Sequence, residues 1–170
     1  IILFLLIGTI LTMIVQASAA TMAITLIMCA NGWISLELGA ALVLGENIGT
    51  TITANLAALT ANTQAKRAAL AHFVFNVFGV IWVLIVFHPF MELVNWVVDT
   101  FFQSNNPEVA ISYKLSAFHS IFNICNVCIL IWAVKLIERT VCALIHPKEE
   151  DEEPRLRFIT CLLYTSPSPR

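Results

Sequence analysis

Two apolar stretches, each close to the ~20 residues that an α-helix needs to cross a bilayer, constrain this chain most. They are Ala71–Met91 and Leu115–Val134. Of the 170 residues, 59% are hydrophobic and only 12% are charged, about half the charged share of an average soluble domain. We therefore expect an all-α, polytopic (multi-pass) protein of the cell (plasma) membrane, solvated largely by membrane lipid.

The Lys and Arg residues predict the orientation of these stretches, because cytoplasmic loops of membrane proteins are enriched in them. Lys66 and Arg67 precede the first stretch, and Lys135 and Arg139 follow the second, whereas the loop 99–114 contains one Lys. We expect the Lys66 loop and the C-terminus to be cytoplasmic. The net charge of -2 offers no basic surface for nucleic acid.

The chain begins without Met and inside an apolar run, so we expect it to be part of a longer protein. Residues 1–145 form the expected transmembrane unit. The acidic segment 146–159 predicts a cytoplasmic linker, and residues 160–170 share no pattern with the rest, which indicates a non-native tail.

The first 59 residues divide into apolar pieces too short to span a membrane singly. The pieces are separated at Gln16–Thr21, at Asn31-Gly32 and at Gly45–Thr51. Irregular backbone at membrane depth survives only where protein or a watery cavity covers it, and transporters place substrate and ion sites at such breaks. We therefore expect broken helices and a re-entrant hairpin in this part of the chain.

The first polar cluster combines one amide and two hydroxyls, at Gln16, Ser18 and Thr21. Their oxygens can coordinate sodium, and their donors can bind an oxyanion. A half-helix that starts near Met22 would also point its free N–H groups at an anion. The alternative is helix packing through the small residues of the cluster.

The second cluster is the segment Gly45–Thr51, whose two glycines permit a tight turn. Asn47 supplies a polar group there, and Thr50 and Thr51 are candidates to cap the next helix; the alternative is a capped turn without a ligand. Glu46 is an acid deep in an apolar stretch, a pattern that indicates a functional carboxylate. It would carry coupling charge for a cation or a proton, or else lie in water at a hairpin tip.

A short repeat, HxxFN, occurs twice, as His72–Asn76 and His119–Asn123. Each copy places His and Asn four residues apart on one helix face. In lipid this polar stripe must face protein or water. It predicts either hydrogen bonds between helices or a direct role in a site.

The sequence gives little support for catalysis. Cys125 and Cys128 have CxxC spacing, but they lie in an apolar stretch without a second ligand pair, which favours packing. No metalloprotease, hydrolase or metal-site motif is present, and nothing marks Ser18 as a nucleophile. We expect neither an enzyme nor an organic cofactor.

Three motifs in this order and spacing resemble the type II sodium–phosphate cotransporter family, in its bacterial branch. They are Gln16–Thr21 (QASAAT), Gly45–Ala54 (GENIGTTITA) and Lys66–Gly79 (KRAALAHFVFNVFG). The resemblance covers about residues 10–80 and continues more loosely through Phe118–Asn123. That family has two inverted repeats, each with a QSSS motif beside a re-entrant hairpin, and binds phosphate and sodium between them.

The resemblance implies that this chain holds the second repeat, that the first repeat lies upstream, and that a PhoU-like domain can follow the linker. Gln16 and Ser18 match the first and third positions of QSSS, whereas Ala17 and Ala19 lack its hydroxyls. The hairpin motif is matched by Asn47, Gly49, Thr50 and Thr51. Glu46 has no counterpart in the better-known animal members, so its role does not transfer.

The implied function is sodium-coupled import of inorganic phosphate, with Na⁺ held by Gln16, Ser18 and Thr21. Phosphate would lie near the membrane midplane, at half-helix N-termini and hydroxyls. One alternative is a transporter of the same fold for another oxyanion, or one coupled to protons through Glu46. Another is a membrane anchor that does not transport and serves a cytoplasmic regulatory domain.

Overall fold

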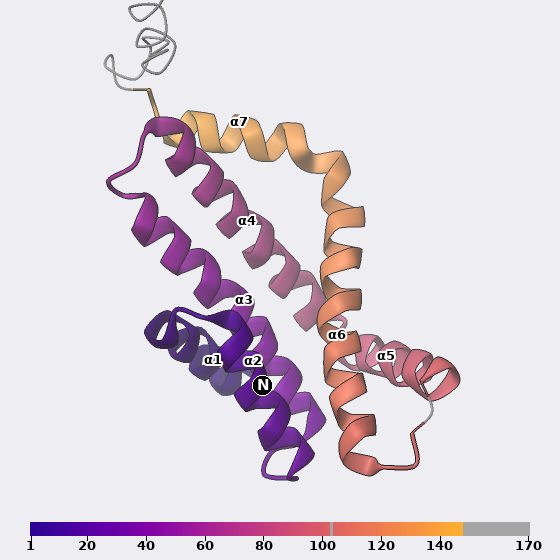
Figure 1. The fold of residues 1–170 in the computed structure, drawn as a ribbon. Coiled ribbons are helices and arrows are strands. Elements are labelled where there is room, and N and C mark those ends of the chain that lie inside the picture. Colours follow the sequence, from indigo (N-terminus) through magenta and orange to yellow (C-terminus); the bar gives the residue numbers. More distant parts are fainter. Residues whose placement is uncertain (103, 148–170) are drawn as a thin grey trace, which may run out of the picture.

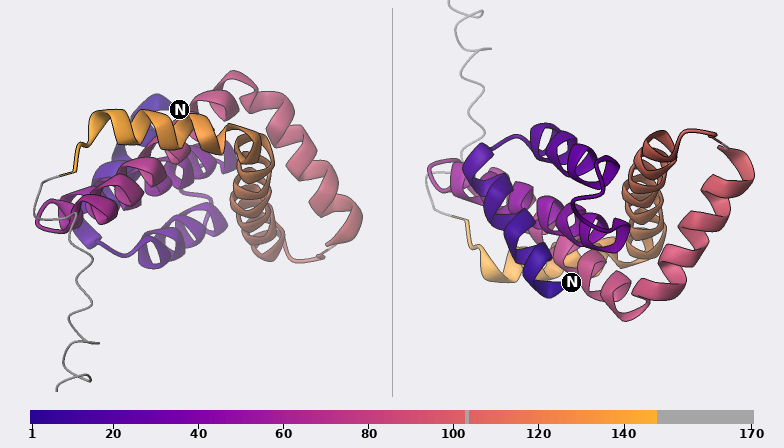
Figure 2. Two further views of the ribbon diagram at one scale, coloured as in Figure 1. Left: turned by 90° about the horizontal axis from the view of Figure 1, so that it is seen from above. Right: turned by 90° about the horizontal axis from the view of Figure 1, so that it is seen from below.

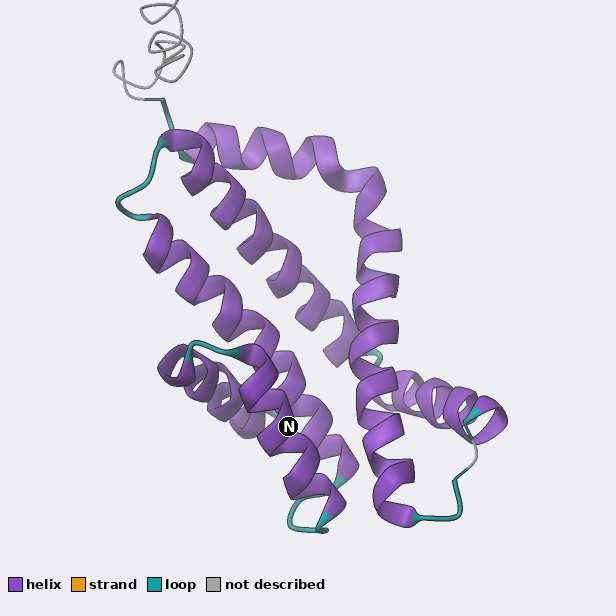
Figure 3. Cartoon of the chain, viewed as in Figure 1, coloured by secondary structure: helices purple, strands orange, loops and turns teal. Residues whose placement is uncertain are grey.

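The structure, a computed structural model, describes residues 1–102 and 104–147. All regular structure in these residues is helical, which confirms the predicted all-α class (Figure 3). The elements are, in chain order, α1 (Ile2–Val15), α2 (Ser18–Ala30), α3 (Leu36–Ala58), α4 (Thr63–Ile85), α5 (Phe87–Phe101), α6 (Pro107–Leu130), η1 (Ile131–Ala133) and α7 (Val134–Leu144). The predicted tail 160–170 and most of the predicted linker lie outside the described residues.

The chain breaks between α1 and α2, where the first polar cluster predicted a break. Gln16 adopts a left-handed conformation with φ 56° and ψ 22°, and Ala17 is extended. The two short helices are joined across the break, since the Thr12 and Thr21 hydroxyl oxygens lie 3.2 Å apart. The sequence placed the start of the second half-helix near Met22, but α2 already begins at Ser18.

The second predicted break is absent. Helix α3 runs without interruption from Leu36 to Ala58 through the cluster Gly45–Thr51, so the prediction of a turn there was wrong. The hydroxyls of Thr50 and Thr51 do not cap a new helix but donate to the carbonyls of Glu46 and Ile48 within α3. A re-entrant hairpin stays a prediction.

The glycines of α3 serve close packing and not a turn. A Cβ on Gly45 would collide with the carbonyl oxygen of Leu5, and one on Gly49 would lie 2.6 Å from that of Thr9. Gly8 of α1 faces the Leu42 carbonyl of α3 in the same way. Small residues therefore bring the two backbones together, as in packed membrane helices, and Thr9 donates to the Gly45 carbonyl at 3.1 Å.

Two long segments are apolar enough to cross a membrane, namely Thr63–Ile85 and Pro107–Leu144. The first ends six residues before the end of the predicted stretch Ala71–Met91. Pro89 explains the early end, because it lacks the N–H that would bond to the Ile85 carbonyl. The chain continues instead as α5, which leaves α4 at an angle (Figure 1).

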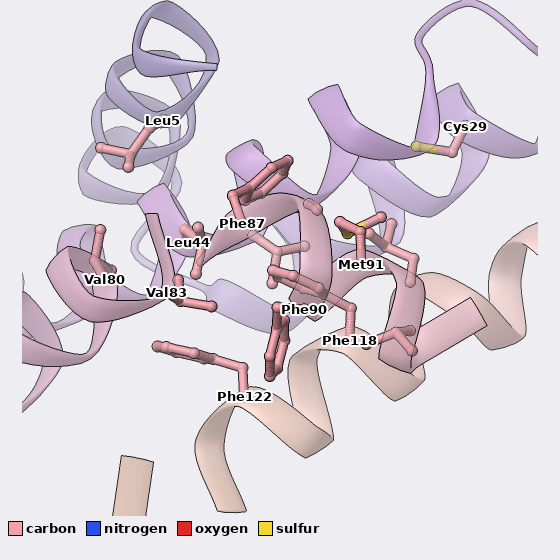
Figure 4. Close-up of a cluster of buried hydrophobic side chains, with 14 residues drawn as sticks. Leu5, Cys29, Leu44, Val80, Val83, Phe87, Phe90, Met91, Phe118 and Phe122 are labelled. Atoms are coloured by element: carbon pink, nitrogen blue, oxygen red, sulfur yellow. The ribbon is translucent and has the colours of Figure 1, made fainter. Parts of the chain in front are cut away.

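An aromatic cluster joins α3, α4, α5 and α6 (Figure 4). The Phe90 and Phe118 rings meet edge to face, with centroids 5.4 Å apart, and Phe118 stacks on Phe122 at 6.5 Å. Leu44 of α3 is fully buried in the same cluster. This core fixes α6 beside α3, and thus places two of the predicted polar motifs on neighbouring helices.

Helix α7 turns away from α6 and lies across the end of α4, as the views from above and the side agree (Figures 1 and 2). The helix is amphipathic, with Val141 buried and Lys135 and Arg139 exposed. Arg67 Nε and Nη2 both donate to the Ile145 carbonyl, at 3.0 and 2.9 Å. Lys66 and Arg67, predicted in a loop, lie in the first turns of α4. This end of α4 and the end of α7 are therefore at the same end of the molecule, and the 104–106 loop lies at the other (Figure 1). Which end is cytoplasmic stays a prediction.

Candidate functional site

A polar cavity of about 330 Å³ lies where the start of α2 meets α3, α4 and α6. Two larger cavities, about 470 and 400 Å³, lie near α7; the first has Gln64, Arg67, His72 and Glu138 in its lining, and the second is mostly apolar. The polar cavity is the better candidate because it lies at the start of α2 and gathers most of the polar side chains that the sequence marked as candidates. Its lining residues are Ser18, Ala19, Met22, Glu46, Asn47, Thr50, His72, Phe75, Asn76, His119 and Asn123.

The N-terminus of α2 opens toward this cavity, because Ser18 and Ala19 are its first two residues and both line it. No side chain caps this end of the helix. Free N–H groups and the positive end of the helix dipole favour a negative charge at such a position. This arrangement fits the predicted half-helix with its N-terminus toward an anion, except that the helix begins at Ser18 and not near Met22.

Asn47 links the second polar cluster to the second HxxFN motif. Its Oδ1 lies 3.3 Å from His119 Nε2. Since Oδ1 can only accept, the imidazole donates from Nε2. The Nδ2 of Asn47 is buried and has no hydrogen-bond partner within the described structure. An unpaired buried donor is costly, by about 1–3 kcal/mol, and a ligand oxygen in the cavity would satisfy it.

Glu46 contributes the one carboxylate among the described lining residues. It is only 4% exposed, and its Oε1 accepts a hydrogen bond of 2.7 Å from the Thr25 hydroxyl of α2. The alternative that Glu46 lies in water at a hairpin tip is wrong, because the residue is buried in the middle of α3. No Lys or Arg occurs among the described residues that line the cavity.

Both HxxFN motifs face the cavity, so the internal repeat brings its four polar side chains together. Within each motif the Asn Nδ2 donates to the carbonyl of the His four residues earlier, at 3.0 Å for Asn76 and 2.8 Å for Asn123. These bonds fix the amides against their own helices. His119 also bonds to Asn47 of α3. The second motif therefore makes a hydrogen bond between two helices and also lines the cavity.

Four of the predicted site residues do not line the cavity. Gln16 is exposed at the α1–α2 break, and Thr21 is fully buried, where it bonds to Thr12 and to the Ser18 carbonyl. Gly49 packs against α1, and Thr51 is buried with its hydroxyl bonded within α3. Of the predicted sodium ligands Gln16, Ser18 and Thr21, Ser18 alone lines the cavity.

Thr25 was missed by the sequence analysis although it holds the cavity carboxylate. A signal for it exists in the sequence. Thr21, Thr25 and Cys29 recur at four-residue spacing, and all three are buried on one face of α2. A polar residue within such a stripe on an apolar helix must find a partner, and Glu46 is that partner.

Within the described residues, no three His, Cys, Asp or Glu side chains gather as a metal site. What the cavity offers is a helix N-terminus, amide and hydroxyl donors and one carboxylate, enclosed by apolar helices. These groups can bind a small polar or ionic solute. An apolar helical fold with such a cavity beside a helix break is typical of membrane transport proteins.

Comparison with known proteins places the chain within that class. Residues 2–100 match the model of the Na⁺/Pi-cotransporter family, and the chain belongs to this family. It is a family of transporters, which confirms that the chain is not an enzyme. Its description names sodium, the expected coupling ion, and no organic cofactor.

Several relatives are similar over shorter or longer parts of the chain. The Bacillus subtilis uncharacterized protein YqeW is 35% identical over 144 residues, which cover 85% of this chain and 44% of that protein. The rat sodium-dependent phosphate transport protein 2C is 41% identical over 47% of this chain and 14% of its own length. The putative inorganic phosphate export protein YjbB of Salmonella typhimurium is 33% identical over 53% of this chain and 17% of its own.

The chain thus spans less than half the length of these relatives. No solved structure matches it significantly.

Proposed function

We propose that the protein to which this chain belongs imports inorganic phosphate across the cell membrane, driven by sodium. The observation that carries this proposal concerns Asn47, which lines the same cavity as the uncapped start of α2 and whose buried Nδ2 has no hydrogen-bond partner in the described structure. A tetrahedral oxyanion accepts from several donors at once, so it suits this pair of features. Family membership narrows the oxyanion to phosphate.

In this proposal, phosphate is held by Ser18 and Asn47 together with the first N–H groups of α2, and it lies beside Thr50, whose hydroxyl hydrogen is already bonded within α3. The His119 side chain keeps Asn47 Oδ1 occupied, so that Nδ2 is the group turned to the anion. Asn76 and Asn123 shape the opposite wall from α4 and α6. The first repeat, of opposite topology and in the remainder of the longer protein, would complete the site and cover the break at Gln16.

Alternating access would follow from rocking of the two repeats around this cavity. The tight α1–α3 contact, built on Gly8, Gly45 and Gly49, makes these helices one rigid piece. We propose that the end carrying Lys66 and α7 is cytoplasmic, since it holds Lys66 and Arg67 at the start of α4 and the basic residues of α7.

The test uses the full-length protein in proteoliposomes with radiolabelled phosphate outside. An inward sodium gradient should drive accumulation of phosphate, and replacement of sodium by choline should abolish it. Asn47→Asp, which removes the donor and adds a negative charge, should reduce uptake. Uptake that is indifferent to sodium but follows a pH gradient would instead support proton coupling. If the folded wild-type protein and its Gln16→Ala variant both fail to take up phosphate, this result would support a membrane anchor.

Export is the second candidate, because one relative is named a putative inorganic phosphate export protein. The same vesicles separate the two directions when phosphate is loaded inside. Net efflux under a physiological, inwardly directed sodium gradient would favour export. Accumulation under that gradient would favour import.

A further inference from the structure

Glu46 is a buried carboxylate that phosphate transport alone does not explain. It is 4% exposed and shares its cavity with the Asn47 amide proposed to bind the anion. A carboxylate beside a phosphate is repulsive, and its burial is costly without a counter-charge. The cavity therefore needs a positive charge whenever phosphate enters it.

The groups around Glu46 supply hydrogen bonds but no fixed positive charge. Helix α2 provides the Thr25 hydroxyl, which donates to Oε1 at 2.7 Å, and no titratable side chain in the cavity lining. Helices α4 and α6 provide His72 and His119, and His119 Nε2 is engaged with Asn47. In the described chain, the ion pair between side chains is Lys114–Asp99, far along the sequence on α5 and α6.

Hard oxygen donors share the cavity with Glu46. Ser18 and Thr50 both line it, and hydroxyl oxygens, together with a carboxylate, suit hard cations. Of the three residues predicted from the sequence to hold sodium, Ser18 alone lines this cavity, and the fully buried Thr21 hydroxyl is bonded within the protein. The carboxylate at Glu46 is thus the better-placed anchor for a cation.

We propose that the Glu46 carboxylate binds a sodium ion that accompanies phosphate into this cavity, with Ser18 and Thr50 as neighbouring oxygen donors. The inference rests on the proposed function and assigns its coupling site. Sodium binds first and neutralises the Glu46 carboxylate. Phosphate then enters a cavity without net negative charge. Each ligand therefore raises the affinity for the other.

The experiment measures initial phosphate uptake against sodium concentration, with the full-length protein in proteoliposomes. Glu46→Gln keeps the size of the side chain and an oxygen for Thr25 but removes the charge. We expect its half-saturating sodium concentration to rise about tenfold or more, the loss of one good charged ligand. Glu37→Gln is the matched control, since Glu37 is exposed at the start of the same helix, and its sodium curve should equal the wild type.

Glu46→Asp covers the case in which Glu46→Gln does not fold. Aspartate keeps the negative charge on a side chain that is shorter by one methylene group. Sodium should therefore still activate uptake, with a higher half-saturating sodium concentration. If Glu46→Gln or Glu46→Asp folds and its uptake depends on sodium concentration as in the wild type, this result would overturn the assignment. So would loss of pH dependence in Glu46→Gln with sodium activation intact, because Glu46 would then carry a proton. If the wild type itself shows no sodium-driven uptake, the proposed function fails instead.

Discussion

The Oδ1 of Asn47 lies 3.3 Å from the Nε2 of His119, and this contact joins two sequence motifs that are 72 residues apart. It leaves the Nδ2 of Asn47 buried without a partner in the described structure. One side of the amide is thus fixed by protein, and the other is free for a ligand.

Replacing Asn47 should weaken phosphate binding more than it weakens the fold. In Asn47→Asp the donor is lost and a second carboxylate enters the cavity, so we expect the phosphate half-saturation constant to rise about tenfold or more, as for loss of a hydrogen bond to a charged group. Uptake kinetics in proteoliposomes measure it. Asn105→Asp, in the exposed loop before α6, is the control; equal phosphate affinity in both variants would contradict the role of Asn47.

His119 should act on phosphate through Asn47. His119→Leu removes the donor to Oδ1, and we expect a loss of phosphate affinity that His119→Gln partly restores through its own amide. In a double-mutant cycle with Asn47→Ala, the two effects should be coupled by about 0.5–3 kcal/mol, as for residues in contact. Strict additivity of the two phosphate affinities would show that the hydrogen bond does not matter for binding.

The α1–α3 contact should be intolerant of a single methyl group. Gly45→Ala would drive its Cβ into the Leu5 carbonyl, a clash with backbone that costs about 1–3 kcal/mol. Thermal denaturation in detergent should show a clearly lower midpoint. Gly39→Ala on the same helix meets the Cys29 side chain, which can move, and should be milder. The opposite ranking would contradict the packing described for Gly45.

Arg67 should hold α7 in place. Arg67→Lys cannot repeat the two N–H bonds to the Ile145 carbonyl, because a lysine ammonium lacks the planar fork of guanidinium. We expect faster amide hydrogen exchange over α7 and unchanged exchange in α1 and α3. Arg139→Lys, exposed on α7 itself, should leave exchange as in the wild type. No change with Arg67→Lys would mean that packing alone fixes α7.

The sequence predicted the class of fold and the first break well, for identifiable reasons. The polar and small residues Gln16–Thr21 interrupt an apolar run, and the chain breaks there. It failed at Gly45–Thr51, because a glycine that permits a turn equally permits close packing against another helix. Only the position of α1 decides between the two, and that is a tertiary fact.

The candidate site was predicted in part. Ser18, Asn47 and Thr50 line the cavity, whereas Gln16 and Thr21 do not. Spacing along a helix can show which residues share a face, but not which neighbouring helix that face meets. The repeated HxxFN motif was the better guide, since both copies line the cavity and a polar stripe on an apolar helix must face protein or water.

The most direct test of the central claim is protection of the cavity by its ligands. Thr50→Cys is introduced into the full-length protein with its native cysteines replaced, and its rate of modification by a small, charged thiol reagent is measured. If phosphate lies beside Thr50, phosphate and sodium together should slow the reaction about tenfold or more, which corresponds to more than nine-tenths occupancy of the site. A rate unaffected by phosphate, in protein that still transports it, would show that the anion binds elsewhere.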